Sequence, residues 1–352
     1  MQALVQKCHA GALCIGLVSV AFALLTSSCS QSSDDAPLIA YSTFYASDDV
    51  GDVYVVNPET RDDHKLTRGW NVSWSPEGDR LVFVDGSDDD FSDLWVINRD
   101  GTERRLLAKD GNRPAWSPAG DEIAFLRRTA NGEGRDIHVV DMESGVARRL
   151  TYSGSYTWSP VWSPDGTHLA AEETRDDLQT QVVLINRDGS DKRVLARPPP
   201  RPPEHSQHDT GPVWSPDGKQ IAFDRSLADN DGGVFEHHMY VIGSNGAGLR
   251  QLTGDGGFGP AWSPDGRQIA YGVDGNIYVV GADGSGRLRL TDSGTDSAPE
   301  WSPDGSQIAF LSTRADRPDL IYSYLYVMDA DGSNEVRLGH AATEDVPAWS
   351  SG

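Results

Sequence analysis

The sequence predicts an all-β protein, specifically a seven-bladed β-propeller. A period of roughly 40 to 50 residues is typical of propeller blades, each of which is a four-stranded sheet. The 352 residues include 37 glycines and 20 prolines, and none after residue 30 form the pattern of a long helix. The period is marked by seven tryptophans, the first six of which open the string W-S-P-(D/E/A)-G: Trp74, Trp116, Trp162, Trp214, Trp262, Trp301 and Trp349.

Each repeat contains four short apolar segments bounded by turn residues, which is typical of strands. The first segment ends in the tryptophan. The second has the pattern of Ile123-Ala124-Phe125, and the third is an apolar run such as Ile277 to Val280. The fourth carries a basic or amide residue followed by Leu or Val and often Thr, as in Arg289-Leu290-Thr291. Each repeat therefore predicts one four-stranded blade.

The connections between these strands predict two different rims. S-P-D-G between strands one and two, and D-G sequences such as Asn98 to Gly101 between strands three and four, are typical of tight hairpins. Because strand direction alternates, both sets of tight turns lie on one rim. The other rim carries the variable loops between strands two and three and the crossings between blades. Loops on a rigid scaffold commonly carry recognition, although such loops can also simply tolerate insertion.

The two ends of the repeat region complement each other. Residues 38–67 supply strands two to four without a tryptophan strand before them, and Pro347-Ala348-Trp349-Ser350 is a tryptophan strand without a blade after it. We therefore predict that the C-terminal strand closes the first blade, since an open ring would expose unpaired strand edges. The propeller domain then extends over residues 38–350.

The N-terminal segment has the pattern of an export signal. Lys7 is its only charged residue, Ala10 to Leu25 is almost continuously apolar, and two serines precede Cys29. The segment resembles the signal of bacterial lipoproteins, although Thr26 replaces the leucine usual at that position. The resemblance implies that Cys29 is lipidated. Cleavage by an ordinary signal peptidase is the alternative.

We accordingly assign a signal peptide to residues 1–28 and a polar tether to residues 29–37. The protein is expected to be exported and lipid-anchored to the cell envelope, in the outer membrane on its periplasmic or surface side. The other two cysteines, Cys8 and Cys14, lie in the signal, so no disulfide is expected after processing. The net charge of −23 repels phosphate backbones, so we expect no nucleic-acid partner. It suits cations or basic partners, or serves solubility alone.

The phrase W-S-P-D-G-x-x-I-A-F, followed by I-Y-V, D-x-D-G and R-L-T, resembles the TolB-type, WD40-like propeller repeat. The match is clearest over residues 262–291 and 301–338 and extends over residues 38–350. It implies a propeller of the bacterial periplasm and envelope that binds protein. The chain departs from TolB in having seven repeats where TolB has six, and in lacking the N-terminal α/β domain of TolB. The resemblance therefore implies the fold more strongly than the role.

The sequence favours a non-catalytic binding protein. It contains no G-x-S-x-G, no H-E-x-x-H and no cysteine after Cys29, so the usual hydrolase and thiol motifs are absent. His205, His208, His237 and His238 are weak candidates for metal ligands. They support the alternative of a metal-assisted polysaccharide lyase or hydrolase. Solvated loop histidines are the simpler interpretation, and no cofactor or metal is expected.

Candidate binding residues lie just before the tryptophan strands, where the chain is expected to reach the mouth of a central channel. The repeats diverge at these positions and place aromatic, polar and charged side chains there. Such a mixture favours binding hot spots, and an envelope protein is the expected partner. The alternative is that these side chains are only solvated. The candidates are Asn71, Arg113, Tyr156, Trp158, Phe258, Glu300 and Asp345.

Overall fold

The computed structural model describes residues 36–43, 51–86, 92–132, 134–152, 157–175, 179–199, 205–229, 234–314, 323–342 and 346–351. These residues form 27 strands and no helix, which confirms the all-β prediction for the described part of the chain. No helix there is long and apolar enough to cross a membrane. The predicted signal peptide, Cys29, Tyr156 and Asp345 lie outside the described residues.

Within each four-stranded unit, consecutive strands pair antiparallel; the strand Arg105–Trp116 continues from one unit into the next, and Thr180 pairs in parallel with His208 between two units. One unit contains β4 (Trp70–Trp74), β5 (Arg80–Asp85), β6 (Ser92–Asn98) and the first part of β7 (Arg105–Trp116). The next contains the end of β7 with β8 (Glu122–Arg128), β9 (Arg135–Asp141) and β10 (Ala147–Arg149). The third contains β11 (Thr157–Trp162), β12 (His168–Thr174), β13 (Thr180–Asn186) and β14 (Arg193–Ala196). The fourth contains β15 (His205–Trp214), β16 (Gln220–Asp229), β17 (Val234–Gly243) and β18 (Arg250–Gln251). The fifth contains β19 (Phe258–Trp262), β20 (Gln268–Val273), β21 (Asn276–Gly281) and β22 (Leu288–Arg289). The sixth contains β23 (Asp296–Trp301), β24 (Gln307–Ser312), β25 (Ser323–Asp329) and β26 (Val336–Ala342).

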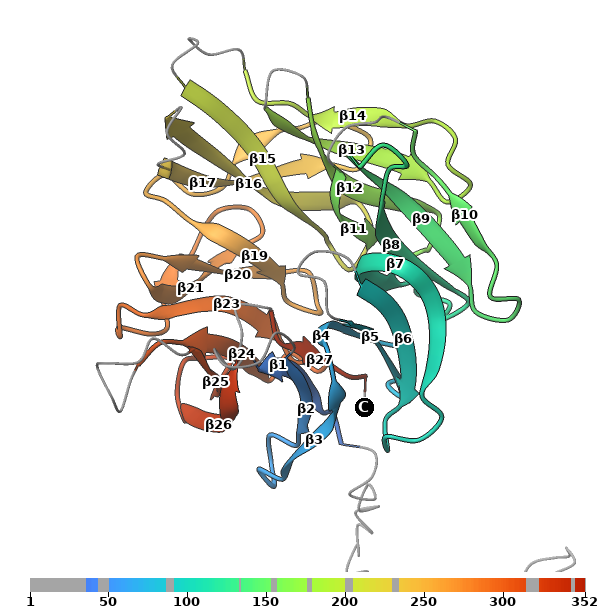
Figure 1. Ribbon diagram of the computed structural model, residues 1–352. Coiled ribbons are helices and arrows are strands. Elements are labelled where there is room, and N and C mark those ends of the chain that lie inside the picture. Colours follow the sequence, from blue (N-terminus) through green and yellow to red (C-terminus); the bar gives the residue numbers. More distant parts are fainter. Residues whose placement is uncertain are drawn as a thin grey trace, which may run out of the picture. The chain divides into compact units, whose positions relative to one another are not determined.

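The remaining unit combines strands from the beginning and the end of the repeat region. It contains β27 (Ala348–Trp349), β1 (Ile39–Thr43), β2 (Asp52–Val56) and β3 (Asp63–Arg68). Figure 1 shows β27, in red, beside β1, in blue, and the register pairs Ile39 with Trp349 and Ala40 with Ala348. First strands of neighbouring units contact one another, and the contacts of β27 with β23 and β4 complete the cycle. These are the contacts that a composite first blade requires. The number of blades and closure in solution stay predictions.

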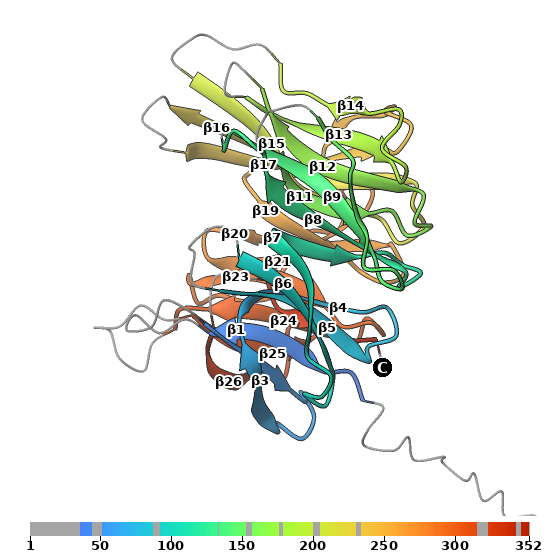
Figure 2. The same cartoon turned by 45° about the vertical axis from the view of Figure 1, so that its right-hand side comes forward.

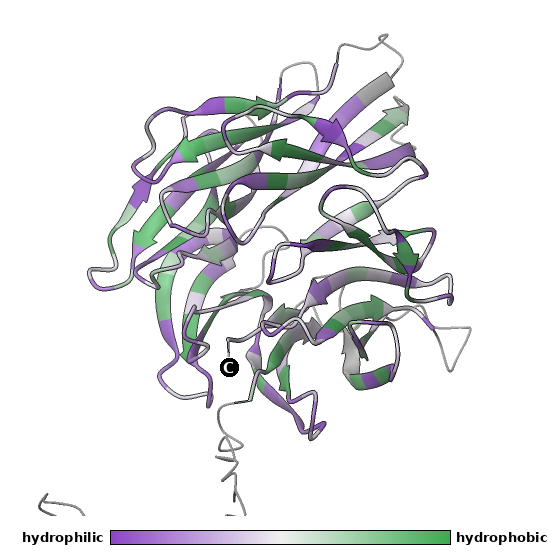
Figure 3. Ribbon diagram, turned by 180° about the vertical axis from the view of Figure 1, so that it is seen from behind, coloured by the Kyte–Doolittle hydropathy of each residue, from purple (hydrophilic) through white to green (hydrophobic). Residues whose placement is uncertain are grey.

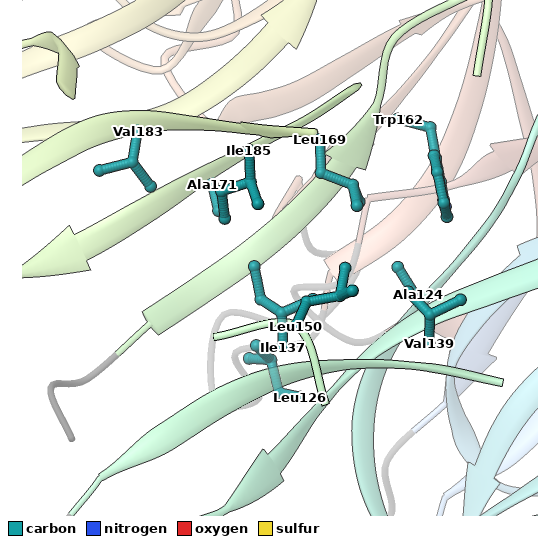
Figure 4. Packing of buried hydrophobic residues seen from close by; sticks show 10 residues of the cluster. All are labelled: Ala124, Leu126, Ile137, Val139, Leu150, Trp162, Leu169, Ala171, Val183 and Ile185. Atoms are coloured by element: carbon teal, nitrogen blue, oxygen red, sulfur yellow. The ribbon is translucent and has the colours of Figure 1, made fainter. Parts of the chain in front are cut away.

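Buried hydrophobic residues form a cluster between each pair of neighbouring units. Figure 3 shows that the hydrophobic residues are concentrated in the strands. The second strands are the most completely buried, since Ile123, Ala124 and Phe125 are all 0% exposed. Figure 4 shows one cluster, in which two units face each other through Ala124, Leu126, Ile137, Val139 and Leu150 on one side and Trp162, Leu169, Ala171, Val183 and Ile185 on the other.

The repeated tryptophans also connect the units through hydrogen bonds. An indole Nε1 donates to the main-chain carbonyl just before the tryptophan of the preceding unit. The distances are 3.1 to 3.3 Å for Trp74, Trp116, Trp162, Trp214, Trp301 and Trp349. The exception is Trp262, whose buried Nε1 has no hydrogen-bond partner among the described residues. The tryptophan therefore fills the space between neighbouring units and satisfies a main-chain carbonyl there.

The predicted tight turns are confirmed. In the turn after Trp162, the Gly166 N–H donates to the Ser163 carbonyl at 2.8 Å. The Ser163 hydroxyl donates to Asp165 at 2.6 Å, and this is the largest cause that lowers the pKa of Asp165 to about 2. The turn between strands three and four lies beside it, because the Arg187 N–H donates to the Thr167 carbonyl at 2.9 Å. Both sets of tight turns therefore share one rim.

Candidate functional site

Six first strands contain a bulge three residues before their tryptophan. The antiparallel register shifts at each of these positions. The bulged residues have φ angles from 46° to 63°: Asn71, Arg113, Ser159, Gly211, Gly259 and Ala298. We call these residues, with the one before each, the bulge edge. A bulge re-aims side chains, and a non-glycine residue in this conformation costs about 1 to 3 kcal/mol. Trp158 pairs with Glu172, near the end of β12, so this part of the bulge edge lies toward the rim opposite the tight turns. In β15 the bulge lies mid-strand, because Thr210 pairs with Asp224 and the pairing continues to Asp229.

Arg113 and Trp158, predicted as binding residues, meet at the bulge edge. The Arg113 guanidinium lies 5.9 Å from the Trp158 ring centroid and 3.5 Å from the Ser159 hydroxyl. Arg135, at the start of β9, stacks more closely on the same ring, at 3.7 Å. Arg113 is exposed, whereas Arg135 and Trp158 are half-buried. One indole therefore contacts two guanidinium groups, an arrangement that cation–π attraction favours. Arg135 was not among the residues predicted from the sequence.

Two carboxyl groups that the sequence analysis also missed lie behind this edge. Glu172 accepts a hydrogen bond from the Gly211 N–H at 2.9 Å, and Asp224 accepts one from the Gly259 N–H at 3.0 Å. Each carboxyl group therefore binds the bulged glycine of the next unit. Asp224 is 9% exposed, and its Oδ1 has no hydrogen-bond partner among the described residues. A sequence signal existed, since these are the only acidic residues directly after the second-strand motif in the repeats.

Burial raises the pKa of both carboxyl groups above the usual value for their side chains. It raises the pKa of Glu172, although the Gly211 N–H and the charge of Arg113 oppose the rise. Burial raises the pKa of Asp224 to about 8, and the nearby charge of Glu172 adds to the rise while the Gly259 N–H opposes it. Asp224 is therefore mostly protonated at neutral pH. Burial likewise raises the pKa of Glu300, another predicted binding residue, to about 7, even though its side chain keeps some exposure.

The candidate histidines lie on the strands β15 to β17, each 10 residues long, which are visible at the upper left of Figure 2. The register aligns His208, Ser226 and His237 in one row across the sheet, and Asp209, Arg225 and His238 in the next. Adjacent rows face opposite sides of a sheet, so His237 and His238 point apart.

These histidines have other neighbours in the described structure. The His208 Nδ1 lies 3.1 Å from the Thr180 hydroxyl, and the Arg225 guanidinium donates to both oxygens of Asp209 at 2.6 and 2.7 Å. Burial lowers the pKa of His208, and burial together with His238 lowers that of His237. The described residues include no group of three or more His, Cys, Asp or Glu side chains placed to bind a metal ion. The structure does not describe the side chain of His205.

A cavity of about 520 Å³ is lined both by candidate metal-binding histidines and by Phe258, a candidate residue for binding a partner. It is lined by His237, His238 and Phe258, together with Glu236, residues 254–257, Val273 and Asp274. The Phe258 ring centroid lies 5.7 Å from that of His237, at an interplanar angle of 48°. Phe258 belongs to the bulge edge, so this cavity opens beside it.

A larger hollow, of about 770 Å³, lies at the tight turns and is lined partly by Arg148 and Arg187. Both guanidinium groups are already bonded to Glu122, at 2.9 and 2.8 Å. Arg187 also forms an ion pair with Asp121 at 2.6 Å, so Glu122 and Asp121 together balance the two guanidinium charges and leave little positive charge for a ligand. Elsewhere on the bulge edge, the Asn71 amide donates to the Asn112 side chain at 2.6 Å.

Four-stranded units arranged around a cycle of first strands define a β-propeller. Residues 23–258 and 257–352 match the TolB beta propeller domain, and the chain belongs to this family. It is 29% identical to the uncharacterized peptidase YuxL of Bacillus subtilis over 186 residues, which are 51% of this chain and 25% of YuxL. It is 34% identical to the Tol-Pal system protein TolB of Anaeromyxobacter dehalogenans over 134 residues, which are 38% of this chain and 27% of that protein. The chain thus spans about a quarter of the length of either relative.

Solved structures share the fold. A putative TolB from Agrobacterium tumefaciens superposes with a TM-score of 0.51 and 24% identity, covering 71% of this chain and 88% of that one. An oligogalacturonate lyase in complex with manganese superposes with a TM-score of 0.62 and 19% identity, covering 84% of this chain and 86% of that one. Proteins as different as a putative TolB and an oligogalacturonate lyase share this fold, so the activity depends on the site that each carries.

Proposed function

We propose that the chain is a non-catalytic binding protein of the bacterial cell envelope that holds a partner protein at its bulge edge. The contact of Trp158 with Arg113 and Arg135 carries this proposal, because Trp and Arg are enriched among residues that dominate binding energy. The similarity to the Tol-Pal system protein TolB supports a place in the envelope. The export signal predicted for residues 1–28 and the lipid anchor predicted at Cys29 support the same location.

The rigidity of the site is a second argument. Arg113 and Trp158 lie at bulges in two neighbouring units, and Glu172, which pairs with Trp158, accepts a hydrogen bond from Gly211 in the unit after that. Side chains held in place lose little freedom when a partner binds. A partner protein therefore meets a prearranged aromatic and cationic surface.

Affinity capture from detergent-solubilised membranes of the protein's own cells tests this proposal. The double variant Arg113→Ala/Trp158→Ala is expected to recover partner about tenfold less efficiently than the wild type, as loss of a hot spot predicts. The control Lys219→Ala/Arg267→Ala removes two cations that are 80% and 85% exposed at the tight turns, and should capture normally. Thermal unfolding should be nearly unchanged in both.

The opposite pattern of capture would move the binding surface to the tight-turn rim. Metal-dependent turnover of a polysaccharide that is lost in His208→Ala or His237→Ala would replace this proposal with the enzymatic alternative. Capture that is equal in the wild type and both variants would also contradict it.

A further inference from the structure

Three arginine side chains gather beside Trp158 at the bulge edge. The guanidinium groups of Arg113 and Arg135 lie 5.9 and 3.7 Å from the centroid of its ring. Arg128 pairs directly with Arg135 in the register of β8 and β9, so the two side chains leave the sheet on the same face. Three strands, β7, β8 and β9, therefore bring positive charge to one indole ring.

The face that carries Arg128 and Arg135 is turned toward the unit of β11, which contacts both β8 and β9 (Figure 1). Leu126 and Ile137, each two residues away along its strand, pack in the same cluster as Trp162. Side chains two residues apart in a strand share a face, so the two arginines continue this face to the ends of the strands. Like charges directly opposite each other in a sheet are unfavourable. An anion bound beside them would reduce that cost.

Arg113 keeps most of its donors for a ligand within the described structure. Its side chain is exposed, and its polar contact there is with the Ser159 hydroxyl at 3.5 Å, which is long for a hydrogen bond. Its charge opposes the rise in the pKa of Glu172, but the two groups form no ion pair among the described residues. Arg128 and Arg135 have further interactions within the protein. Arg113 is therefore the main donor of this cluster.

The described carboxyl groups next to this cluster have other partners. Asp136 lies on the opposite face of β9 from Arg135 and accepts a hydrogen bond from Arg149 at 2.6 Å. Glu173, at the end of β12, is paired with Lys192. Among the described residues, the surroundings of Arg113 thus form a locally positive region on a chain whose net charge is −23.

Carboxylates are the ligands that suit this arrangement. A guanidinium on an aromatic face keeps its N–H donors in its own plane, and a carboxylate accepts such donors in pairs. The Trp158 ring adds apolar surface for the methylene groups of an acidic side chain. The net charge of the chain favours basic partners in general and repels an acidic segment from the rest of the surface. An acidic segment is therefore directed to this one region.

From this arrangement we infer that the bulge edge at Trp158 binds acidic side chains of the partner protein, held by Arg113 together with Arg135. The existence of a partner rests on the proposed function. The arginine cluster adds the charge of the recognised segment, which is opposite to the sign that the net charge alone favours.

Isothermal titration of the full chain with an acetylated, amidated hexa-glutamate peptide tests this assignment. Hexa-glutamine is the uncharged control of nearly equal shape. We expect the glutamate peptide to bind at least about tenfold more tightly than the glutamine peptide. Arg113→Gln should lose about tenfold in affinity for the glutamate peptide. Arg113→Lys keeps the charge but not the paired donors, and should lose about threefold.

The matched control is Arg267→Gln, which removes the same charge from a side chain that is 85% exposed at the tight turns. It should bind the glutamate peptide like the wild type. An equal loss in the control would show that only the overall charge matters, and equal binding of hexa-glutamine would show that carboxylates are not recognised. Displacement of the peptide by inorganic phosphate at equal concentration would identify a phosphate group as the ligand. Tighter binding to phosphatidylglycerol vesicles that Arg113→Gln abolishes would identify a membrane surface. Each of these outcomes overturns the inference.

These measurements do not depend on the capture experiment. Peptide binding that depends on Arg113, together with capture that is insensitive to Arg113→Ala/Trp158→Ala, would leave recognition of acidic side chains standing and remove the proposed function. Capture that depends on these two residues without binding of the glutamate peptide would do the reverse.

Discussion

The Trp74 indole Nε1 donates to the Ala348 carbonyl at 3.1 Å, across a separation of 274 residues. Trp349 in turn donates to the Glu300 carbonyl at 3.3 Å, and its strand pairs with Ile39 and Ala40 of β1. The C-terminal strand is thus bonded on both sides. It therefore connects its two neighbouring units through the hydrogen bonds of Trp349 and Trp74.

Deleting residues 347–352 should therefore destabilise the whole domain. The deletion removes the indole of Trp349 and exposes the edge of β1, so we expect a loss of about 3 to 5 kcal/mol and increased aggregation. Urea unfolding and size-exclusion chromatography measure these effects. Deleting only Ser351 and Gly352, which keeps β27, is the control. Equal stability of the two truncated proteins would contradict closure by this strand.

The contribution of the tryptophan hydrogen bond to stability can be measured separately from the contribution of the ring's packing. Trp162→Phe removes the 3.1 Å hydrogen bond to the Ala115 carbonyl, whereas the Trp262 Nε1 has no hydrogen-bond partner among the described residues. We expect Trp162→Phe to cost about 1 kcal/mol more than Trp262→Phe. Urea unfolding followed by circular dichroism compares the two. If the costs are equal, these hydrogen bonds contribute nothing to stability beyond packing.

Asp224 should make stability fall as the pH rises toward 8. Its pKa in the folded protein, about 8, lies above the ordinary value of 3.8, so the folded state retains a proton that the unfolded chain releases. This contribution is complete below about pH 4 and is lost as the pH rises through about 8, at up to about 1.4 kcal/mol per pH unit. Asp224→Asn keeps an acceptor for the Gly259 N–H and removes the titration. The variant should therefore show a flatter profile and exceed the wild type in stability above pH 8.

Thermal unfolding between pH 5 and 9 measures that profile. Part of the slope should remain in Asp224→Asn, because burial also raises the pKa of Glu300 to about 7. Asp188→Asn is the control, since hydrogen bonds from Ser190 lower the pKa of Asp188 and its titration lies below this range. A wild-type slope that Asp224→Asn leaves unchanged would show that Asp224 is ionised in the folded protein.

The predicted lipid anchor depends on Cys29. Cys29→Ser should block processing or release the protein from membranes, because the acylated sulfur is lost. Detergent phase partitioning and mass analysis of the mature N-terminus measure the outcome. A mature wild-type N-terminus at another residue, without a lipid, would favour ordinary signal cleavage.

Only part of the site could be predicted from the sequence. Repeats that agree at Trp162 and diverge at Trp158 indicated the proposed binding position, because divergence within an aligned repeat needs no structure to detect. Arg135 could not be found in this way. It lies 23 residues before Trp158 in the chain, on another unit, and only the packing of neighbouring units places its guanidinium on that ring.

The sequence by itself determined the strands, the tight turns and the pairing of the two chain ends, since each of these follows from local residue preferences repeated at one period. Only the tertiary structure decided which side chains of different units meet. Asp224 is an unremarkable carboxylate in the sequence, yet burial between two units raises its pKa to about 8 against the opposing hydrogen bond from the Gly259 N–H. Phe258 and His237 belong to different strands, and their shared cavity results from the path of the crossing at residues 254–257. Burial and contacts between distant segments depend on how the units pack, and no local pattern contains that information.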